Sequence, residues 1–156
     1  MELKTGSAES TLDDKGRVNI PVRFREQYQG ELVVTRGFES CVWIMTPAVW
    51  EQFKQNILNS EVLTQEERDN LEYKHLYQAQ KVDLDKAGRI AIPQPIRKYA
   101  GLSKDCMVIR TEDRLDIWDS GIFDTYLAEK DTTARAAFNK LGSKNIFRAE
   151  TKASEG

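Results

Sequence analysis

The stretch LDDKGRVNIPVRFR at residues 12–25 occurs a second time in the chain, as LDKAGRIAIPQPIR at residues 84–97. The two strings lie 72 positions apart, and Leu, Asp, Gly, Arg, Ile, Pro and the final Arg coincide. A looser match continues downstream, where residues 32–34 are echoed by residues 107–109. Repetition at a fixed spacing indicates two copies of one structural unit, so the chain is interpreted as a tandem repeat.

Each copy contains an aspartate followed three residues later by a glycine, namely Asp13 with Gly16 and Asp85 with Gly88. An aspartate side chain can cap the backbone amides of a tight turn, and glycine adopts the positive φ that such turns require. The spacing therefore predicts two hairpin loops, shaped by these four residues and flanked by strands.

The residues after the first loop alternate between polar and apolar side chains. In a strand with this period of two, Val18 and Ile20 are expected to face a core, while Arg17 and Asn19 face outward. Residues 89–92 follow the same pattern in the second copy.

A proline follows each of these strands and predicts the start of a short helix, because proline suits the first helical turn. The two prolines are Pro21 and Pro93. In the second copy Pro95 is expected to shorten or kink that helix. A further strand pair is predicted after each helix, over residues 107–111 and 115–118 in the second copy.

Helices are predicted between and after the copies. Thr46 with Pro47 marks one start, and a capping box at residues 64–67 opens a helix through about Tyr77. Ser120 is expected to cap a third helix, and residues 133–141 to form a last one before a frayed tail. The predicted organisation is repeat 1 at 6–52, a helical connector at 53–79, repeat 2 at 80–127, and a C-terminal helix with its tail at 128–156.

Composition bounds the class of protein. The 156 residues, of which 40% are hydrophobic, suffice for a buried core. The longest apolar run, residues 41–45, is far shorter than the roughly 20 residues that a membrane span needs. The chain also opens without an apolar signal region, so a soluble cytoplasmic protein is expected.

Few residues could support catalysis or hold a metal. His75 is the only histidine, and its polar neighbours predict a solvated side chain. Cys41 and Cys106 lie beside apolar runs without a C-x-x-C spacing, which favours buried, reduced thiols. Histidine-rich zinc sites are excluded and phosphate-binding glycine motifs are missing from the sequence, so no enzyme activity, cofactor or metal is expected.

The repeated string, written D-x-x-G-R-h-x-I-P-x-x-h-R with h for an apolar residue, resembles the AbrB-type swapped-hairpin DNA-binding module. Two such modules in a chain of this length resemble the MraZ family of bacterial transcriptional regulators. The resemblance implies a mainly β fold with flanking helices (α+β), in which the two half-modules build a double-split β-barrel. It also implies ring-like homo-oligomers that bind direct DNA repeats upstream of the division and cell-wall gene cluster.

Charge is unevenly distributed in a way that suits DNA binding. The chain carries a net charge of -2, but residues 13–25 carry +2 and residues 85–98 carry +3. These basic islands are expected to meet double-stranded DNA, and a ring would add avidity. The candidate DNA-binding residues are Arg17, Arg89, Lys15, Lys86, Arg23, Arg25 and Arg97. A planar guanidinium on a rigid strand suits guanine edges or phosphates.

Structural alternatives exist for the arginines. Arg17 and Arg89 could merely pair with the loop aspartates, and Arg25 and Arg97 could cover the core with their stems. At the level of function, the alternatives are an antitoxin-type protein-binding module, with the segment from Ala128 wrapping a partner, and a non-specific nucleoid-associated DNA binder. Neither a membrane nor a small-molecule substrate is an expected partner.

Overall fold

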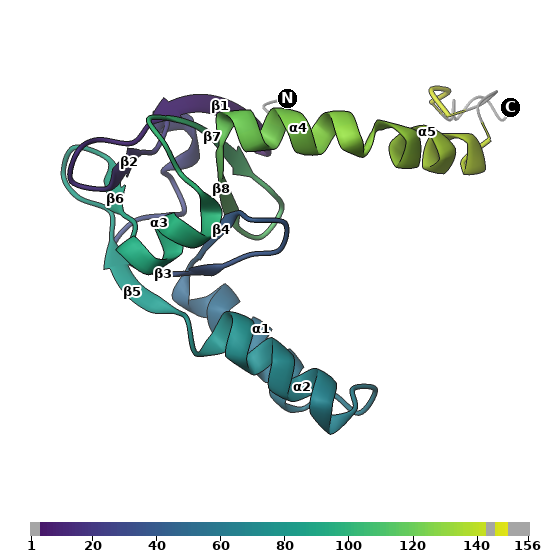
Figure 1. Cartoon of the computed structure of the whole chain (residues 1–156), viewed down its shortest axis with the longest axis horizontal. Helices are drawn as coiled ribbons and strands as arrows, with labels where there is room; N and C mark the ends of the chain where they lie inside the picture. Colours follow the sequence, from purple (N-terminus) through teal and green to yellow (C-terminus); the bar gives the residue numbers. More distant parts are fainter. Residues whose placement is uncertain (1–3, 143–145, 150–156) are drawn as a thin grey trace, which may run out of the picture. The chain divides into compact units, whose positions relative to one another are not determined.

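The structure is a computed structural model that describes residues 4–142 and 146–149 (Figure 1). The chain divides into two compact units, Met1–Phe123 and Asp124–Gly156. The first unit holds repeat 1, the helical connector and repeat 2 up to Phe123, and the second holds the rest of the C-terminal segment. No helix in the described part of the chain is both long and apolar enough to span a membrane.

A six-stranded antiparallel sheet dominates the first unit, with the strand order β1-β7-β8-β4-β3-β5. The order reads the same in both directions when each strand is exchanged for its counterpart in the other repeat. The two repeats are therefore interleaved about a pseudo-twofold axis between β4 and β8, and neither repeat forms a sheet of its own. The strands are β1 (Gly6–Thr11), β3 (Glu31–Arg36), β4 (Val42–Met45), β5 (Gln80–Asp83), β7 (Asp105–Arg110) and β8 (Leu115–Asp119).

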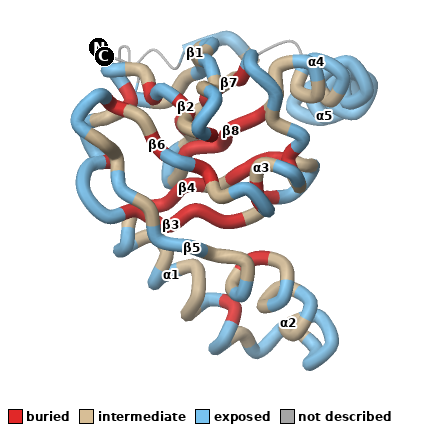
Figure 2. Tube along the Cα trace, turned by 60° about the vertical axis from the view of Figure 1, so that its left-hand side comes forward, coloured by how far each residue is buried: buried red, intermediate tan, exposed pale blue. Residues whose placement is uncertain are grey.

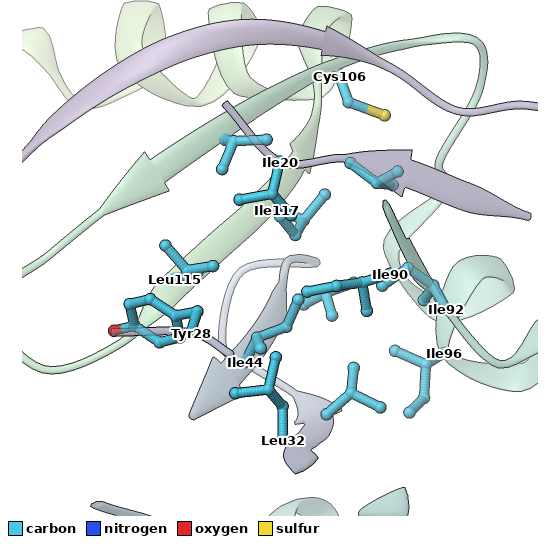
Figure 3. Packing of buried hydrophobic residues seen from close by; sticks show 14 of the residues in the cluster. Ile20, Tyr28, Leu32, Ile44, Ile90, Ile92, Ile96, Cys106, Leu115 and Ile117 are labelled. Atoms are coloured by element: carbon cyan, nitrogen blue, oxygen red, sulfur yellow. The ribbon is translucent and has the colours of Figure 1, made fainter. Parts of the chain in front are cut away.

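A second, two-stranded sheet pairs β2 (Arg17–Asn19) with β6 (Arg89–Ala91) in antiparallel register. Val18 and Ile90 lie opposite each other and are fully buried, as the alternation predicts. They share one hydrophobic cluster with residues of the large sheet such as Leu32 and Ile117 (Figure 3). The expectation of a mainly β fold with flanking helices is confirmed.

The helix after each short strand differs between the repeats. In repeat 1 it is the three-residue 3-10 turn η1 (Val22–Phe24), and in repeat 2 it is the seven-residue helix α3 (Gln94–Ala100). The prediction that Pro95 shortens or kinks its helix is wrong. Pro95 lies in the first turn, where a missing backbone N–H costs no intrahelical hydrogen bond.

Helix α1 (Pro47–Leu58) begins within repeat 1 and runs into the connector, which continues with α2 (Gln65–Leu71) and a π-helical turn, η2 (Glu72–Leu76). Thr46 caps α1 and the capping box of Thr64 opens α2, as predicted. The helix expected to run through Tyr77 instead widens into the π-turn at Glu72. Much of the connector is exposed (Figure 2).

His75 corrects the expectation of a solvated histidine, since its side chain is fully buried. Its ring stacks on Trp43 with the centroids 4.9 Å apart, and its Nδ1 lies 2.8 Å from the Arg36 carbonyl oxygen. His75 is buried because η2 packs against β3, although the residues next to it in the sequence are polar. The two cysteines are free and buried, and burial raises the pKa of Cys41 to about 12 and of Cys106 to about 11.

The C-terminal segment is helical. Helix α4 spans Ser120–Glu129 and α5 spans Asp131–Lys140. The predicted cap at Ser120 is wrong by one residue, because Asp119 Oδ2 accepts the hydrogen bond from the Ile122 amide. The predicted frayed tail lies largely outside the described residues, since 143–145 and 150–156 are not described.

Candidate nucleic-acid interface

The two hairpin loops have the same local geometry. Asp13 Oδ1 accepts hydrogen bonds from the Lys15 and Arg17 amides, each at 2.9 Å. Asp85 Oδ1 accepts from the Ala87 and Arg89 amides at the same distance. These backbone hydrogen bonds are the main cause that lowers the pKa of both aspartates, so the loops contain ionised carboxylates at neutral pH.

The two loops are joined to the opposite repeats through their glycines. Gly16 and Gly88 have φ values of +78° and +82°, a region in which side chains other than hydrogen are strained. The Gly88 carbonyl accepts from the Ile20 amide at 2.8 Å, and the Gly16 carbonyl accepts from the Ile92 amide at 2.9 Å. Each loop is thus bonded to the end of the other repeat's strand.

Arg25 and Arg97 lie against these loops from the opposite repeat. Arg25 Nε donates to the Ile20 carbonyl at 2.6 Å, and a Cβ added to Gly88 would lie 2.1 Å from the Arg25 guanidinium carbon. Arg97 lies against Gly16 in the corresponding way, but it donates to the Ile92 carbonyl through Nη1 rather than Nε. Both guanidinium groups therefore support the backbone of the ribbon, which is the β2–β6 strand pair with its two loops.

The outward face of the ribbon carries four side chains: Arg17, Asn19, Arg89 and Ala91. Arg17 is registered opposite Ala91, and Asn19 opposite Arg89. Asn19 and Ala91 are exposed, whereas the two arginines are half-buried. Because the residues that alternate with these four are buried, this face points toward solvent. The ribbon therefore presents two guanidinium groups and one amide on a short, rigid surface.

Both outward arginines pair with loop aspartates. Arg17 Nε lies 2.7 Å from Asp13 Oδ2, and Arg89 Nε lies 3.0 Å from Asp85 Oδ2. Arg89 Nη1 also lies 3.8 Å from Asp13 Oδ2, so Asp13 links the two repeats across the ribbon. The Asp–Arg pairs orient the guanidinium groups, and their contact with solvent makes each pair a weak contributor to stability.

The other predicted cations lie around the ribbon. Lys15 and Lys86 are exposed in the loops, and no carboxylate of the described residues lies within 4.0 Å of either ammonium group. Arg23 is exposed on η1, where its Nη2 donates to the Ser7 carbonyl at 2.6 Å and its guanidinium lies 4.8 Å from the Phe24 ring centroid.

One outward residue was not among the candidates from the sequence. Asn19 is exposed on the outward face, as the alternation predicts, but it carries no charge and so is not among the basic candidates. The period-two alternation places Asn19 on the same face as Arg17, and this is the sequence feature that could identify it as a candidate DNA contact.

Comparison with known proteins identifies the family. Residues 3–72 and 76–141 match a family model described as "MraZ protein, putative antitoxin-like". The chain is 38% identical to the transcriptional regulator MraZ of Parafrankia sp. (strain EAN1pec) over 130 residues, 82% of this chain and 89% of that protein. It is 34% identical to the transcriptional regulator MraZ of Treponema denticola over 139 residues, 88% of this chain and 96% of that protein. Both copies of the repeated string fall within the family match, and the chain belongs to the MraZ family.

Proposed function

We propose that this protein is a sequence-specific DNA-binding transcriptional regulator. The observation that carries the proposal is the ribbon face, on which Arg17 and Arg89 stand outward from a buried strand pair. A two-stranded β-ribbon fits the major groove of B-DNA, and arginine is the commonest side chain to bind guanine there. The relatives' name, transcriptional regulator, supports the same function.

Each predicted site residue has a role in this proposal. Arg17 and Arg89 contact base edges, because their shortest ion pairs use Nε and leave Nη1 and Nη2 of Arg17, and Nη2 of Arg89, for the ligand. Lys15, Lys86 and Arg23 contact phosphates, which positions the ribbon on the duplex. The loop residues Asp13, Gly16, Asp85 and Gly88 shape the ribbon. Arg25 and Arg97 support its backbone, and their positive charge attracts the DNA.

The proposal extends to assembly and target. The two interleaved repeats form the double-split β-barrel, and copies of it join into a ring-like homo-oligomer. Such a ring binds direct repeats upstream of the division and cell-wall gene cluster, in the nucleoid of the cytoplasm. Multiple weak contacts on repeated sites add through avidity, which compensates for the net charge of -2 on each chain.

Footprinting and gel-shift titration on DNA upstream of the protein's own gene test the proposal. Protection is expected to recur at about one helical turn, roughly 10 bp. The double variant Arg17→Ala/Arg89→Ala should lose the footprint, while Arg135→Ala, which removes an exposed arginine from α5, should keep it. Unchanged affinity in the double variant with normal melting would refute the ribbon as the interface. A monodisperse 17.9 kDa species in light scattering would refute the ring.

A second candidate function is an antitoxin-type protein-binding module. It is favoured by the family description, which includes the words antitoxin-like. The two functions are separated by the dependence of DNA affinity on salt. A regulator that contacts phosphates loses affinity with a log-log slope of about -0.9 per phosphate neutralised. A flat response on the upstream fragment would favour the protein-binding alternative.

A further inference from the structure

The outward face of the ribbon breaks the symmetry of the two repeats at one exposed position. Asn19 in repeat 1 corresponds to Ala91 in repeat 2, whereas Arg17 corresponds to Arg89. We infer that Asn19 is a specificity-determining residue that binds the base edge of an adenine in the major groove. The inference rests on the proposed function, since it assigns one base contact within the same interface.

The backbone fixes the direction of the Asn19 side chain. Its neighbours Val18 and Ile20 are fully buried, so residue 19 must face away from the core. It lies in register opposite Arg89, which places an amide and a guanidinium side by side on the outward face. Any duplex that meets Arg89 also meets Asn19, because cross-strand neighbours are only about 5 Å apart at Cβ.

Arg25 restrains the Asn19 side-chain amide but leaves most of its hydrogen-bonding capacity free. Its Nη2 lies 3.5 Å from Asn19 Oδ1, at the long end of the hydrogen-bonding range. An amide oxygen accepts two hydrogen bonds, so one lone pair of Oδ1 and both hydrogens of Nδ2 stay available. In repeat 2, Arg97 has no such side chain above it, since residue 91 is alanine. The restraint exists in repeat 1 alone.

The free edge of the amide matches the free edge of adenine. Asn Oδ1 can accept from adenine N6 while Nδ2 donates to N7, and no other base offers this donor and acceptor pair in the major groove. Ala91 offers only a methyl group, which suits the methyl of thymine. The ribbon therefore meets two different half-sites with its two strands. It binds its DNA in one orientation, as repeated sites in the same direction require.

In vitro selection from a randomised duplex library tests this inference. The wild-type protein should enrich a motif with an invariant A·T pair at one position of each repeat. Asn19→Ala should lose the preference at that position alone, by roughly 10- to 100-fold in relative affinity, with the rest of the motif retained. Asn70→Ala, which truncates an exposed asparagine of α2, is the matched control and should keep the full motif.

The outcomes separate the two levels of the proposal. A wild-type motif that Asn19→Ala leaves unchanged, with wild-type melting of the variant, would overturn the role of Asn19 but not DNA binding. An adenine preference lost together with all other positions would show that Asn19 supports the ribbon rather than a base contact, which also overturns the inference. If the wild-type protein enriches no motif, sequence-specific binding fails and the role of Asn19 fails with it.

Discussion

The two repeats share a backbone frame and differ in the side chains placed on it. In both loops the aspartate accepts two amide hydrogen bonds at 2.9 Å, and in both the glycine carbonyl bonds to the opposite repeat. The exposed residues diverge, with Asn19 and Arg23 of repeat 1 replaced by Ala91 and Pro95 in repeat 2. The repeated string therefore encodes the ribbon, while the two repeats differ at exposed positions that the ribbon does not need for its own backbone contacts.

The cross-repeat contacts make the ribbon a joint product of both copies. Asp13 lies within 4 Å of arginines from both repeats, whereas Asp85 pairs only with Arg89 among the described residues. Arg25 and Arg97 pack on the other repeat's loop. A substitution in one repeat is therefore expected to change the contacts and the stability of the other.

The largest effect is expected when a side chain is added at the loop glycines. Gly16→Ala and Gly88→Ala each force alanine into positive φ and place its Cβ against the supporting arginine. Each should lower the free energy of unfolding by about 2–3 kcal/mol, measured by denaturant titration. Gly30→Ala is the matched control, because Gly30 has φ +69° with no atom within 4 Å of the added Cβ. It should cost only about 1 kcal/mol.

Removing the supporting arginine should reduce the cost at the glycine. In an Arg97→Ala background, Gly16→Ala is expected to cost about as much as Gly30→Ala, because the three atoms nearest to the added Cβ all belong to Arg97. This double-mutant cycle measures the coupling between the repeats directly. Additive free energies in the cycle would show that the Arg97 contact with the loop carries no energy.

A smaller effect is expected from truncating one outward arginine at a time. Arg17→Ala and Arg89→Ala should each weaken binding to the upstream DNA by about 10- to 100-fold, because each removes one bidentate contact. Calorimetric melting should shift little, since exposed ion pairs are worth roughly 0–1 kcal/mol. If one variant binds as tightly as the wild type, only the other repeat contacts bases, and the ribbon binds through one strand.

Features that depend on residues close together in the chain could be predicted from the sequence, whereas contacts between distant residues could not. The outward position of Arg17 and the capping box of Thr64 follow from residues close in the chain, and local patterns identified them. The packing of Arg97 on Gly16 and the burial of His75 depend on contacts between residues far apart in sequence. The periodicity of the sequence does not specify which repeat covers which loop, so the interleaving of the two repeats could not be predicted from the sequence.

Introducing asparagine in repeat 2 should restore symmetry to the ribbon. Ala91→Asn is expected to add a second adenine preference of about 5- to 10-fold at the position related by the pseudo-twofold axis. The gain is smaller than the loss in Asn19→Ala, because Arg97 donates through Nη1 to the Ile92 carbonyl and is less free to restrain the new amide. In vitro selection from a randomised duplex library measures this gain in adenine preference. Unchanged preference in Ala91→Asn would mean that repeat 2 does not approach the bases.

The smallest effect concerns acid and arises in repeat 1, since His75 packs on Trp43 and bonds to the Arg36 carbonyl, both in that repeat. Burial lowers the pKa of His75 from its ordinary value of 6.5, so the unfolded chain binds a proton more readily than the folded one. The contribution of His75 is fully present above pH 6.5 and declines as the pH falls below it, by at most about 1.4 kcal/mol per pH unit.

Urea titrations from pH 7.5 down to about 5.5 measure this dependence, with His75→Gln as the control that keeps a donor but cannot titrate. The wild-type protein should lose more stability over this range than the variant, and the difference should begin near pH 6.5. Both proteins share the loop aspartates, whose lowered pKa values place their own loss of stability at more acidic pH. Parallel curves for the two proteins would mean that His75 takes up its proton as easily in the folded chain as in the unfolded one.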